Sequence, residues 1–292
     1  METTPALVIK NATLKLEGNE ILHDFNWRVE RGEHWFILGP NGAGKTTLIK
    51  LITRLYDPTE GQILVKMILG MAWPLFGAEV CVLGNRYGAC DITEVRKKVA
   101  WASPFLQAWT ADTSIRWKTI DVALSGLDST VGFYRKASGE EMELALSALE
   151  RIGAKHLADR YFDRLSSGEQ IKALIARALI AKPELVILDE TCVYLDLRSR
   201  EFLLEAIDAL AAAENSPTML FITQRIEEIT ASFDRGIILG NGRITSCGMR
   251  GDVLNEVNLS DAFGVPIKLY PRPDGRLWPG LGEIFQKNRG ID

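Results

Sequence analysis

A glycine-rich stretch near the N-terminus carries the residue types that bind a phosphate group. It reads FILGPNGAGKTTL over residues 36–48 and fits the pattern G-x-x-x-x-G-K-[S/T]. Glycines let backbone N–H groups turn toward phosphate oxygens, and the positive end of a following helix adds to the attraction. Lys45 would reach the β- and γ-phosphates, and the hydroxyl of Thr46 would bind Mg²⁺. The residues expected around the triphosphate are Gly39, Pro40, Asn41, Gly42, Ala43, Gly44, Lys45, Thr46 and Thr47.

Two adjacent acids follow an apolar run, LVIL, at residues 185–188. Asp189 can hold a Mg²⁺ ion, and Glu190 can orient and deprotonate an attacking water. A solvated strand end would explain the two acids equally well if they stood alone. In a chain that also carries a phosphate-binding loop, the pair favours hydrolysis of a nucleoside triphosphate.

A third stretch, LSSGEQ at residues 165–170, opens the clearest amphipathic pattern of the chain, over 168–181. Ser166 or Ser167 would cap a helix there, which is a purely structural role. A serine hydroxyl together with the N–H groups of a helix end can also bind an anion. The residues alone leave both interpretations open.

The elements that must position these stretches alternate between strands and helices. Short apolar runs predict an antiparallel sheet at the N-terminus, with strands at 7–9, 13–16 and 25–29. Further along, buried strands are expected at 35–38, 185–188, 219–223 and 236–239, and helices at 46–56, 120–127, 140–152, 168–181 and 198–213. This alternation predicts a parallel sheet with helices on both faces. Residues 84–94 are expected to form a loop.

Composition narrows the class of protein. The chain has 292 residues, of which 47% are hydrophobic and 25% charged, which is typical of a globular protein. Its net charge of −4 gives no general attraction to nucleic acid, and no nucleic-acid partner is expected. Its four cysteines lack metal-binding spacing and favour a cytoplasmic location. The apolar run at 62–83 is broken by Lys66, Pro74 and Glu79, which predicts buried strands and turns instead of a membrane span.

The three stretches, in this order and spacing, resemble the nucleotide-binding domain of ATP-binding cassette (ABC) proteins over about residues 6–250. The resemblance implies an α/β fold: a P-loop NTPase core with a mostly parallel sheet, an N-terminal antiparallel β-subdomain and an inserted helical subdomain. It implies one such domain at 1–260, with the helical insertion at about 105–164, and a small C-terminal appendage at 261–292. ATP and Mg²⁺ are the implied cofactors.

The resemblance also implies a head-to-tail dimer with a second copy of the chain. Each ATP would lie between the phosphate loop of one subunit and the LSSGE stretch of the other. Ser166 and Gly168 would therefore act on the partner's nucleotide, and Asp196 would communicate across the interface. Gln107 is the best match to the family's glutamine that senses Mg²⁺ and the attacking water.

Several positions depart from the family's pattern. Gln224 stands where most members carry a histidine; its amide can donate to the γ-phosphate but cannot carry positive charge, which predicts slowed hydrolysis with binding retained. Leu16 matches the aromatic that stacks on adenine, which predicts comparable affinities for ATP and GTP. Tyr194 replaces a glycine, and packing is favoured over a block to dimer closure. Cys192 is expected to fill space.

The favoured function is an ATP-binding and ATP-hydrolysing subunit that drives a separately encoded membrane permease. The chain would then be cytoplasmic, and peripheral at the inner face of the membrane through that permease. The alternative is a soluble ABC ATPase that acts on or regulates a cytosolic complex. A nucleotide-binding regulator with little turnover is a third class, which Gln224 favours and Glu190 disfavours. The segment beyond Asp261 resembles a small C-terminal appendage of some short stand-alone members, and residues 120–134 resemble members linked to molybdate, iron-chelate and metal uptake.

Overall fold

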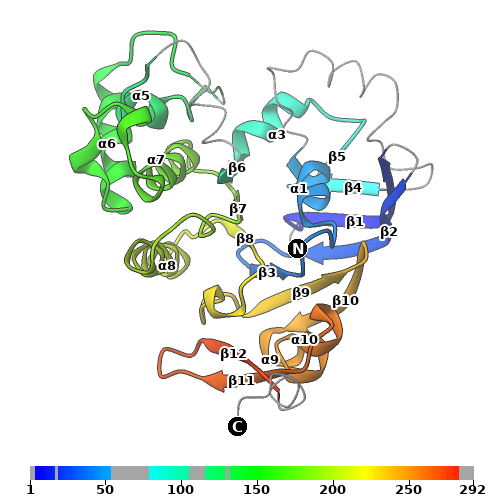
Figure 1. Ribbon diagram of the computed structural model, residues 1–292. Helices are drawn as coiled ribbons and strands as arrows, with labels where there is room; N and C mark the ends of the chain where they lie inside the picture. Colours follow the sequence, from blue (N-terminus) through cyan, green and yellow to red (C-terminus); the bar gives the residue numbers. More distant parts are fainter. Residues whose placement is uncertain are drawn as a thin grey trace. The chain divides into compact units, whose positions relative to one another are not determined.

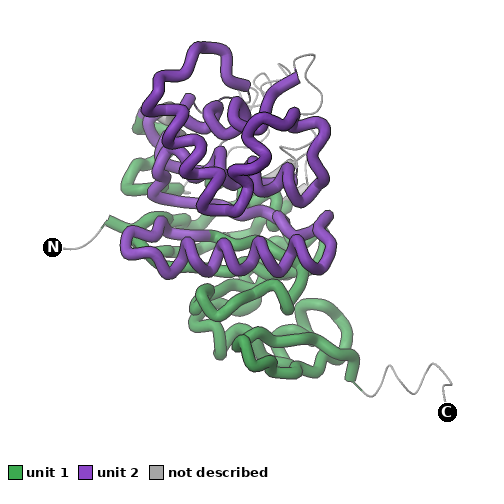
Figure 2. The backbone as a smooth tube through the Cα atoms, turned by 90° about the vertical axis from the view of Figure 1, so that its left-hand side faces the viewer, with its two compact units in different colours: residues 1–90, 220–292 green, residues 91–219 purple. Residues whose placement is uncertain are grey.

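The computed structural model describes residues 4–16, 19–53, 79–104, 116–128, 130 and 132–282 (Figure 1). The chain divides into two compact units (Figure 2). The first contains Met1–Cys90 and Leu220–Asp292, and the second contains Asp91–Met219. Within the described ranges, none of the helices has the length and apolar character needed to cross a membrane.

The N-terminal part of the first unit is an antiparallel sheet. Its strand order is β2-β1-β4-β5, formed by β1 (Leu7–Leu16), β2 (Asn19–Val29), β4 (Glu79–Val82) and β5 (Asn85–Arg86). The pairing of β1 with β2 shifts register between Ile9 and Ala12 and twice more before Lys15. Asn11 takes a φ of 50° there, and its N–H donates to Asn26 Oδ1 over 2.9 Å. The runs expected at 7–9 and 13–16 are therefore one bulged strand.

The second sheet of the first unit carries the phosphate loop. Its strands lie in the order β10-β9-β3-β8, with β3 at His34–Leu38, β8 at Thr218–Thr223, β9 at Arg235–Gly240 and β10 at Arg243–Met249. β3 pairs with β9 in parallel, whereas β9 pairs with β10 in antiparallel fashion. Phe36, Ile37 and Leu38 of β3 are completely buried, as expected for a strand covered on both faces.

A helical segment and a β-hairpin end the described chain. They comprise α9 (Arg250–Val253), α10 (Glu256–Phe263), β11 (Ile267–Pro271) and β12 (Leu277–Leu281). The carboxylate of Glu256 accepts from Lys268 Nζ and from the N–H of Leu269, both over 3.0 Å, and so ties the hairpin to α10. The appendage that was expected to begin at 261 thus starts inside a helix, and the domain limits stay a prediction.

The second unit combines a parallel strand pair with helices. β6 (Val99–Ala102) pairs in parallel with β7 (Leu185–Asp189). The helices are α3 (Ile92–Lys98), α5 (Thr119–Leu124), α6 (Gly139–Arg151), α7 (Ser167–Leu179) and α8 (Leu197–Ala211), of which α5, α6 and α7 contact one another (Figure 1). The prediction of a loop over residues 84–94 was wrong, because β5 and the start of α3 lie within that range. Helices occur where 120–127 and 140–152 were expected.

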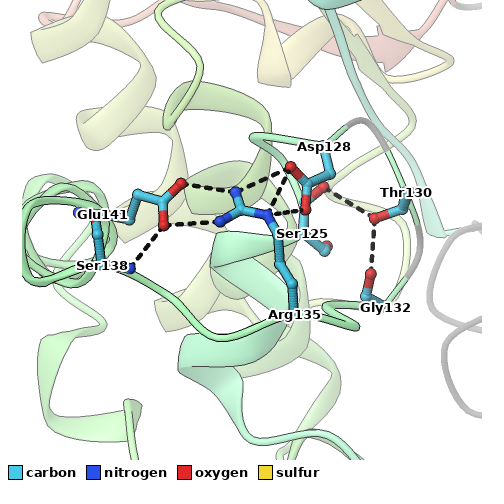
Figure 3. A network of polar contacts seen from close by, with 7 residues as sticks. All are labelled: Ser125, Asp128, Thr130, Gly132, Arg135, Ser138 and Glu141. Atoms are coloured by element: carbon cyan, nitrogen blue, oxygen red, sulfur yellow. Dashed lines mark hydrogen bonds and ion pairs between the residues drawn. The ribbon is translucent and has the colours of Figure 1, made fainter.

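Arg135 fixes the connection between α5 and α6. Its guanidinium lies between the carboxylates of Asp128 and Glu141, with nitrogen–oxygen distances of 3.0 and 2.7 Å (Figure 3). Glu141 also accepts the N–H of Ser138, which caps α6. The hydrogen bonds from Arg135 and then from Ser138 lower the pKa of Glu141 from 4.5 to about 2.

Removing this guanidinium should destabilise the protein in a pH-dependent manner. Because the pKa of Glu141 is depressed in the folded state, its contribution is complete above pH 4.5 and is lost as the pH falls toward 2. We expect Arg135→Ala to lower the thermal unfolding midpoint by a constant amount above pH 4.5, and by progressively less below it. Lys155→Ala, which breaks an exposed pair with Glu150, is the control and should have a smaller effect. A pH-independent difference for Arg135→Ala would contradict the assignment.

Candidate functional site

The phosphate-binding loop encloses the lysine that follows it. The loop joins β3 to α1 (Lys45–Thr53), and the side chain of Lys45 lies inside it, with the residue only 5% exposed. Its Nζ donates to the carbonyl oxygens of Gly39 and Pro40 over 2.8 and 3.0 Å. A buried ammonium group needs such partners, and the carbonyl groups hold it within the curve of the loop. The charge expected to attract phosphate is therefore held within the loop by the loop's own carbonyl groups.

At two glycines of the loop, a side chain would clash with its surroundings or strain the backbone. A Cβ on Gly39 would lie 2.5 Å from the carbonyl oxygen of Leu239 in β9. Gly44 has a φ of +101°, and a Cβ there would lie 3.1 Å from Leu22 Cδ2 and 3.2 Å from the carbonyl oxygen of Ile21. The loop thus packs directly on β9 and β2, which explains why these two positions are glycine.

The other predicted loop residues lie at its surface or at the start of α1. Asn41 and Gly42 are exposed, Ala43 is buried, and Pro40 is half-buried. In the first turn of α1, Thr46 is exposed and Thr47 is half-buried. A hydroxyl at this point of a helix stands beside the positive end of the helix dipole, where anions bind.

The two predicted acids end a completely buried strand in the second unit. Asp189 is the last residue of β7 and is 7% exposed; its Oδ2 accepts a hydrogen bond from Ser103 Oγ over 3.1 Å. Glu190 follows with a φ of 49°, and its carbonyl oxygen accepts the N–H of Val193. A positive φ is uncommon outside glycine, and such strain concentrates at functional sites. The chain therefore turns sharply at Glu190 and leaves its side chain half-buried.

Ser166 caps α7, as one of the two interpretations of LSSGEQ expected. Its Oγ accepts the N–H of Glu169, and the Glu169 carboxylate accepts the N–H and the hydroxyl of Ser166 over 2.8 and 3.1 Å. Arg160 Nη1 donates to the same carboxylate over 2.9 Å. Burial alone would raise the pKa of Glu169, but the bonds from Ser166 and the charge of Arg160 outweigh it and lower that pKa. This arrangement gives the Glu169 carboxylate its hydrogen-bond partners at the start of α7.

The starts of α7 and α8 lie against each other. A Cβ on Gly168 would lie 3.1 Å from Ser199 Oγ, so Ser199 of α8 would have to shift by a few tenths of an ångström to admit a side chain there. Asp196 caps α8, and its Oδ1 accepts the N–H of Ser199 over 2.8 Å, a bond that lowers the pKa of Asp196. Three predicted residues, Ser166, Gly168 and Asp196, therefore belong to one cluster of helix ends.

Gln224 follows β8 in the first unit and is half-buried. The turn that carries it is fixed by Thr223, whose Oγ1 donates to the buried carboxylate of Glu228 and accepts the N–H of Arg225. β8 lies beside β3 in the sheet, so Gln224 follows the strand next to the one that leads into the phosphate loop.

The remaining predictions have mixed outcomes. Leu16 ends β1, and Gln107 lies outside the described residues. Tyr194 is 67% exposed in the turn that follows Glu190, so the expectation that it packs was wrong. Cys192 is 1% exposed, which confirms that it fills space. Sequence reasoning missed Ser103, whose only signal is its position directly after a strand.

Comparison with known families identifies the class. The family model described as ABC transporter matches residues 22–193. The chain belongs to the ABC transporter family. One ABC relative, the ABC transporter ATP-binding protein YlmA of Bacillus subtilis, is 38% identical over 271 residues, which cover 92% of this chain and 94% of YlmA.

Solved ABC structures confirm the predicted fold class. A metal-chelate type ABC transporter in an inward-facing conformation matches with a TM-score of 0.73 and 22% identity, over 97% of this chain and 100% of its own. The dimeric structure of the bacterial ABC transporter cassette MJ0796 matches with a TM-score of 0.64 and 24% identity, over 83% and 98%. The fold is therefore that of an ABC cassette: a P-loop core with mostly parallel strands, an antiparallel sheet and helices.

Proposed function

We propose that this chain binds and hydrolyses ATP to drive a separately encoded membrane permease. One observation carries the proposal: Lys45 is buried inside a loop whose Gly39 has no space for a side chain and whose Gly44 has a positive φ and close neighbours. Such a loop at a helix N-terminus is built for phosphate groups and serves little other purpose. The family membership supports the coupling of ATP to transport.

The residues present fit a magnesium-bound triphosphate. Mg²⁺ prefers oxygen ligands, and the hydroxyl of Thr46 and the buried carboxylate of Asp189 would supply them. When bound, the ion neutralises charge on the β- and γ-phosphates. Lys45 would hold the same phosphates, and Glu190 would accept a proton from the attacking water. Gln107 is proposed to join the metal site and to sense the attacking water.

ATP would be held between two copies of the chain. The cluster of Ser166, Gly168 and Asp196 supports this, because it gathers the residues that the family places opposite a partner's phosphate loop. The ring of the base would rest on Leu16. The permease would be moved as ATP binding closes this dimer and hydrolysis reopens it.

Purification from the native host tests the transport role. The tagged chain should be recovered from detergent-solubilised membranes together with an integral membrane protein in a fixed ratio. Recovery with a soluble complex, and with no membrane protein, would instead favour an ABC ATPase that acts in the cytosol.

The glutamine at position 224 should slow hydrolysis. Losing one preorganised donor costs about 10² to 10³ in rate, and a neutral amide replaces the family's histidine only in part. We expect Gln224→His to raise kcat by less than about 10²-fold with an unchanged ATP dissociation constant. The double variant with Glu190→Gln is the control and should turn over ATP no faster than Glu190→Gln alone. An unchanged rate for Gln224→His would show that position 224 does not limit turnover.

A further inference from the structure

A buried hydrogen bond within the second unit joins Ser103 to the proposed metal ligand Asp189. The two oxygen atoms lie 3.1 Å apart, and the residues are 4% and 7% exposed. Ser103 belongs to none of the three motifs, and 86 positions separate it from Asp189. Its place in the structure therefore adds a residue to the site that the motifs do not contain.

Strand pairing brings the two side chains together. β6 and β7 run in parallel with Ala102 opposite Leu188, so the next step of the register sets Ser103 beside Asp189. Both residues stand at the carboxyl ends of their strands. Open α/β sheets bind their ligands at this edge. The hydroxyl thus meets the carboxylate at the edge where the nucleotide is expected.

The hydrogen bond from Ser103 limits the orientations that the Asp189 carboxylate can take. A hydroxyl that donates to one oxygen of an aspartate restricts rotation of the side chain, and so sets where the second oxygen points. The backbone offers little freedom for adjustment, because Asp189 ends a buried strand and Glu190 takes a positive φ. Satisfying a buried charge is the competing role for Ser103, and it would not change the affinity for a metal ion.

We infer that Ser103 is a positioning residue that orients the Asp189 carboxylate for the Mg²⁺ ion of bound ATP. The inference rests on the proposed function, in which Asp189 holds that ion. Hydrogen bonds to ligating groups change metal affinity or activity by about 10- to 100-fold when they are removed. Ser103 acts through Asp189 and needs no contact with the nucleotide.

The test is a Mg²⁺ titration of ATP binding in the full chain with Glu190→Gln, which slows turnover by about 10²- to 10⁴-fold. At a fixed ATP concentration, Ser103→Ala should raise the Mg²⁺ concentration at half-maximal binding by about 10-fold. The ATP dissociation constant in EDTA should not change. Ser103→Thr keeps the hydroxyl and should behave as the parent chain. Ser125→Ala is the matched control, because Ser125 is another buried serine of this unit, and its hydroxyl oxygen accepts a hydrogen bond from Arg177.

Asp189→Asn separates failure of the inference from failure of the proposed function. If Asp189→Asn shifts the Mg²⁺ midpoint while Ser103→Ala does not, Ser103 only satisfies a buried charge and the inference is overturned. If Asp189→Asn leaves the midpoint unchanged, the assignment of Asp189 as a metal ligand fails. Thermal unfolding in EDTA checks that the variants are folded. Should Ser103→Ala not fold, Ser103→Cys keeps a weak donor and should give an intermediate shift.

Discussion

Replacing Glu190 with glutamine should reduce ATP turnover by about 10²- to 10⁴-fold, which is the usual contribution of a positioned general base. Glutamine has nearly the same shape as glutamate, but its amide cannot accept the proton of the attacking water. The ATP dissociation constant should change by no more than about two-fold, because the phosphate-binding residues Lys45 and Thr46 are untouched. Phosphate release from a saturating ATP solution, together with an equilibrium binding titration, measures the two quantities.

The control for this substitution is Glu150→Gln. Glu150 is an exposed acid of α6 that pairs with Lys155, so its loss should leave turnover unchanged. Equal turnover in Glu190→Gln and the parent chain would show that another group takes the proton. Loss of ATP binding in Glu190→Gln would show that this residue is needed to build the site.

Gly39→Ala should weaken ATP binding by at least about 10-fold and lower the free energy of unfolding by about 1–3 kcal/mol. The added Cβ would lie 2.5 Å from the carbonyl oxygen of Leu239. Neither a Cβ atom nor a backbone carbonyl group can rotate away from such a contact as the end of a long side chain can. The loop must therefore move away from β9, and the carbonyl oxygens that hold Lys45 move with it. Chemical denaturation and a nucleotide titration measure the two effects.

Gly139→Ala is the matched control for this effect. Gly139 opens α6, its φ is not positive, and a Cβ there would meet nothing within 4 Å. Alanine is also the better helix former, so this variant should be as stable as the parent chain or slightly more stable. If both variants bind ATP equally well, close packing of the phosphate loop on β9 is not needed for function.

Local sequence was sufficient to locate most of the elements around the site. The phosphate loop lies between β3 and α1, and the two acids follow β7, because a strand, a glycine turn and a helix each leave a short-range pattern. The capping role of Ser166 is equally local, since a capping box needs only residues 166–169. These features follow from neighbouring residues and could be predicted.

Features that depend on distant segments could not be predicted. The contact between Ser103 and Asp189 requires the register of β6 against β7, and that register is set by strands 86 positions apart. Tyr194 is exposed in the turn that follows Glu190, and no local pattern indicates either this exposure or the positive φ of Glu190. β1 was divided into two runs because its polar residues Lys10 and Asn11 look like a turn, whereas they form part of a bulge stabilised by Asn26 of β2.

The central claim is that two copies of the chain enclose ATP between a phosphate loop and a partner's Ser166 cluster. Light scattering coupled to gel filtration tests it directly on Glu190→Gln, in which slowed hydrolysis keeps the pair closed for longer. With ATP and Mg²⁺ the mass should double from that of the 32.5 kDa chain, and Ser166→Ala should reduce the dimer fraction. A chain that binds ATP and Mg²⁺ yet keeps the mass of a monomer would contradict the account.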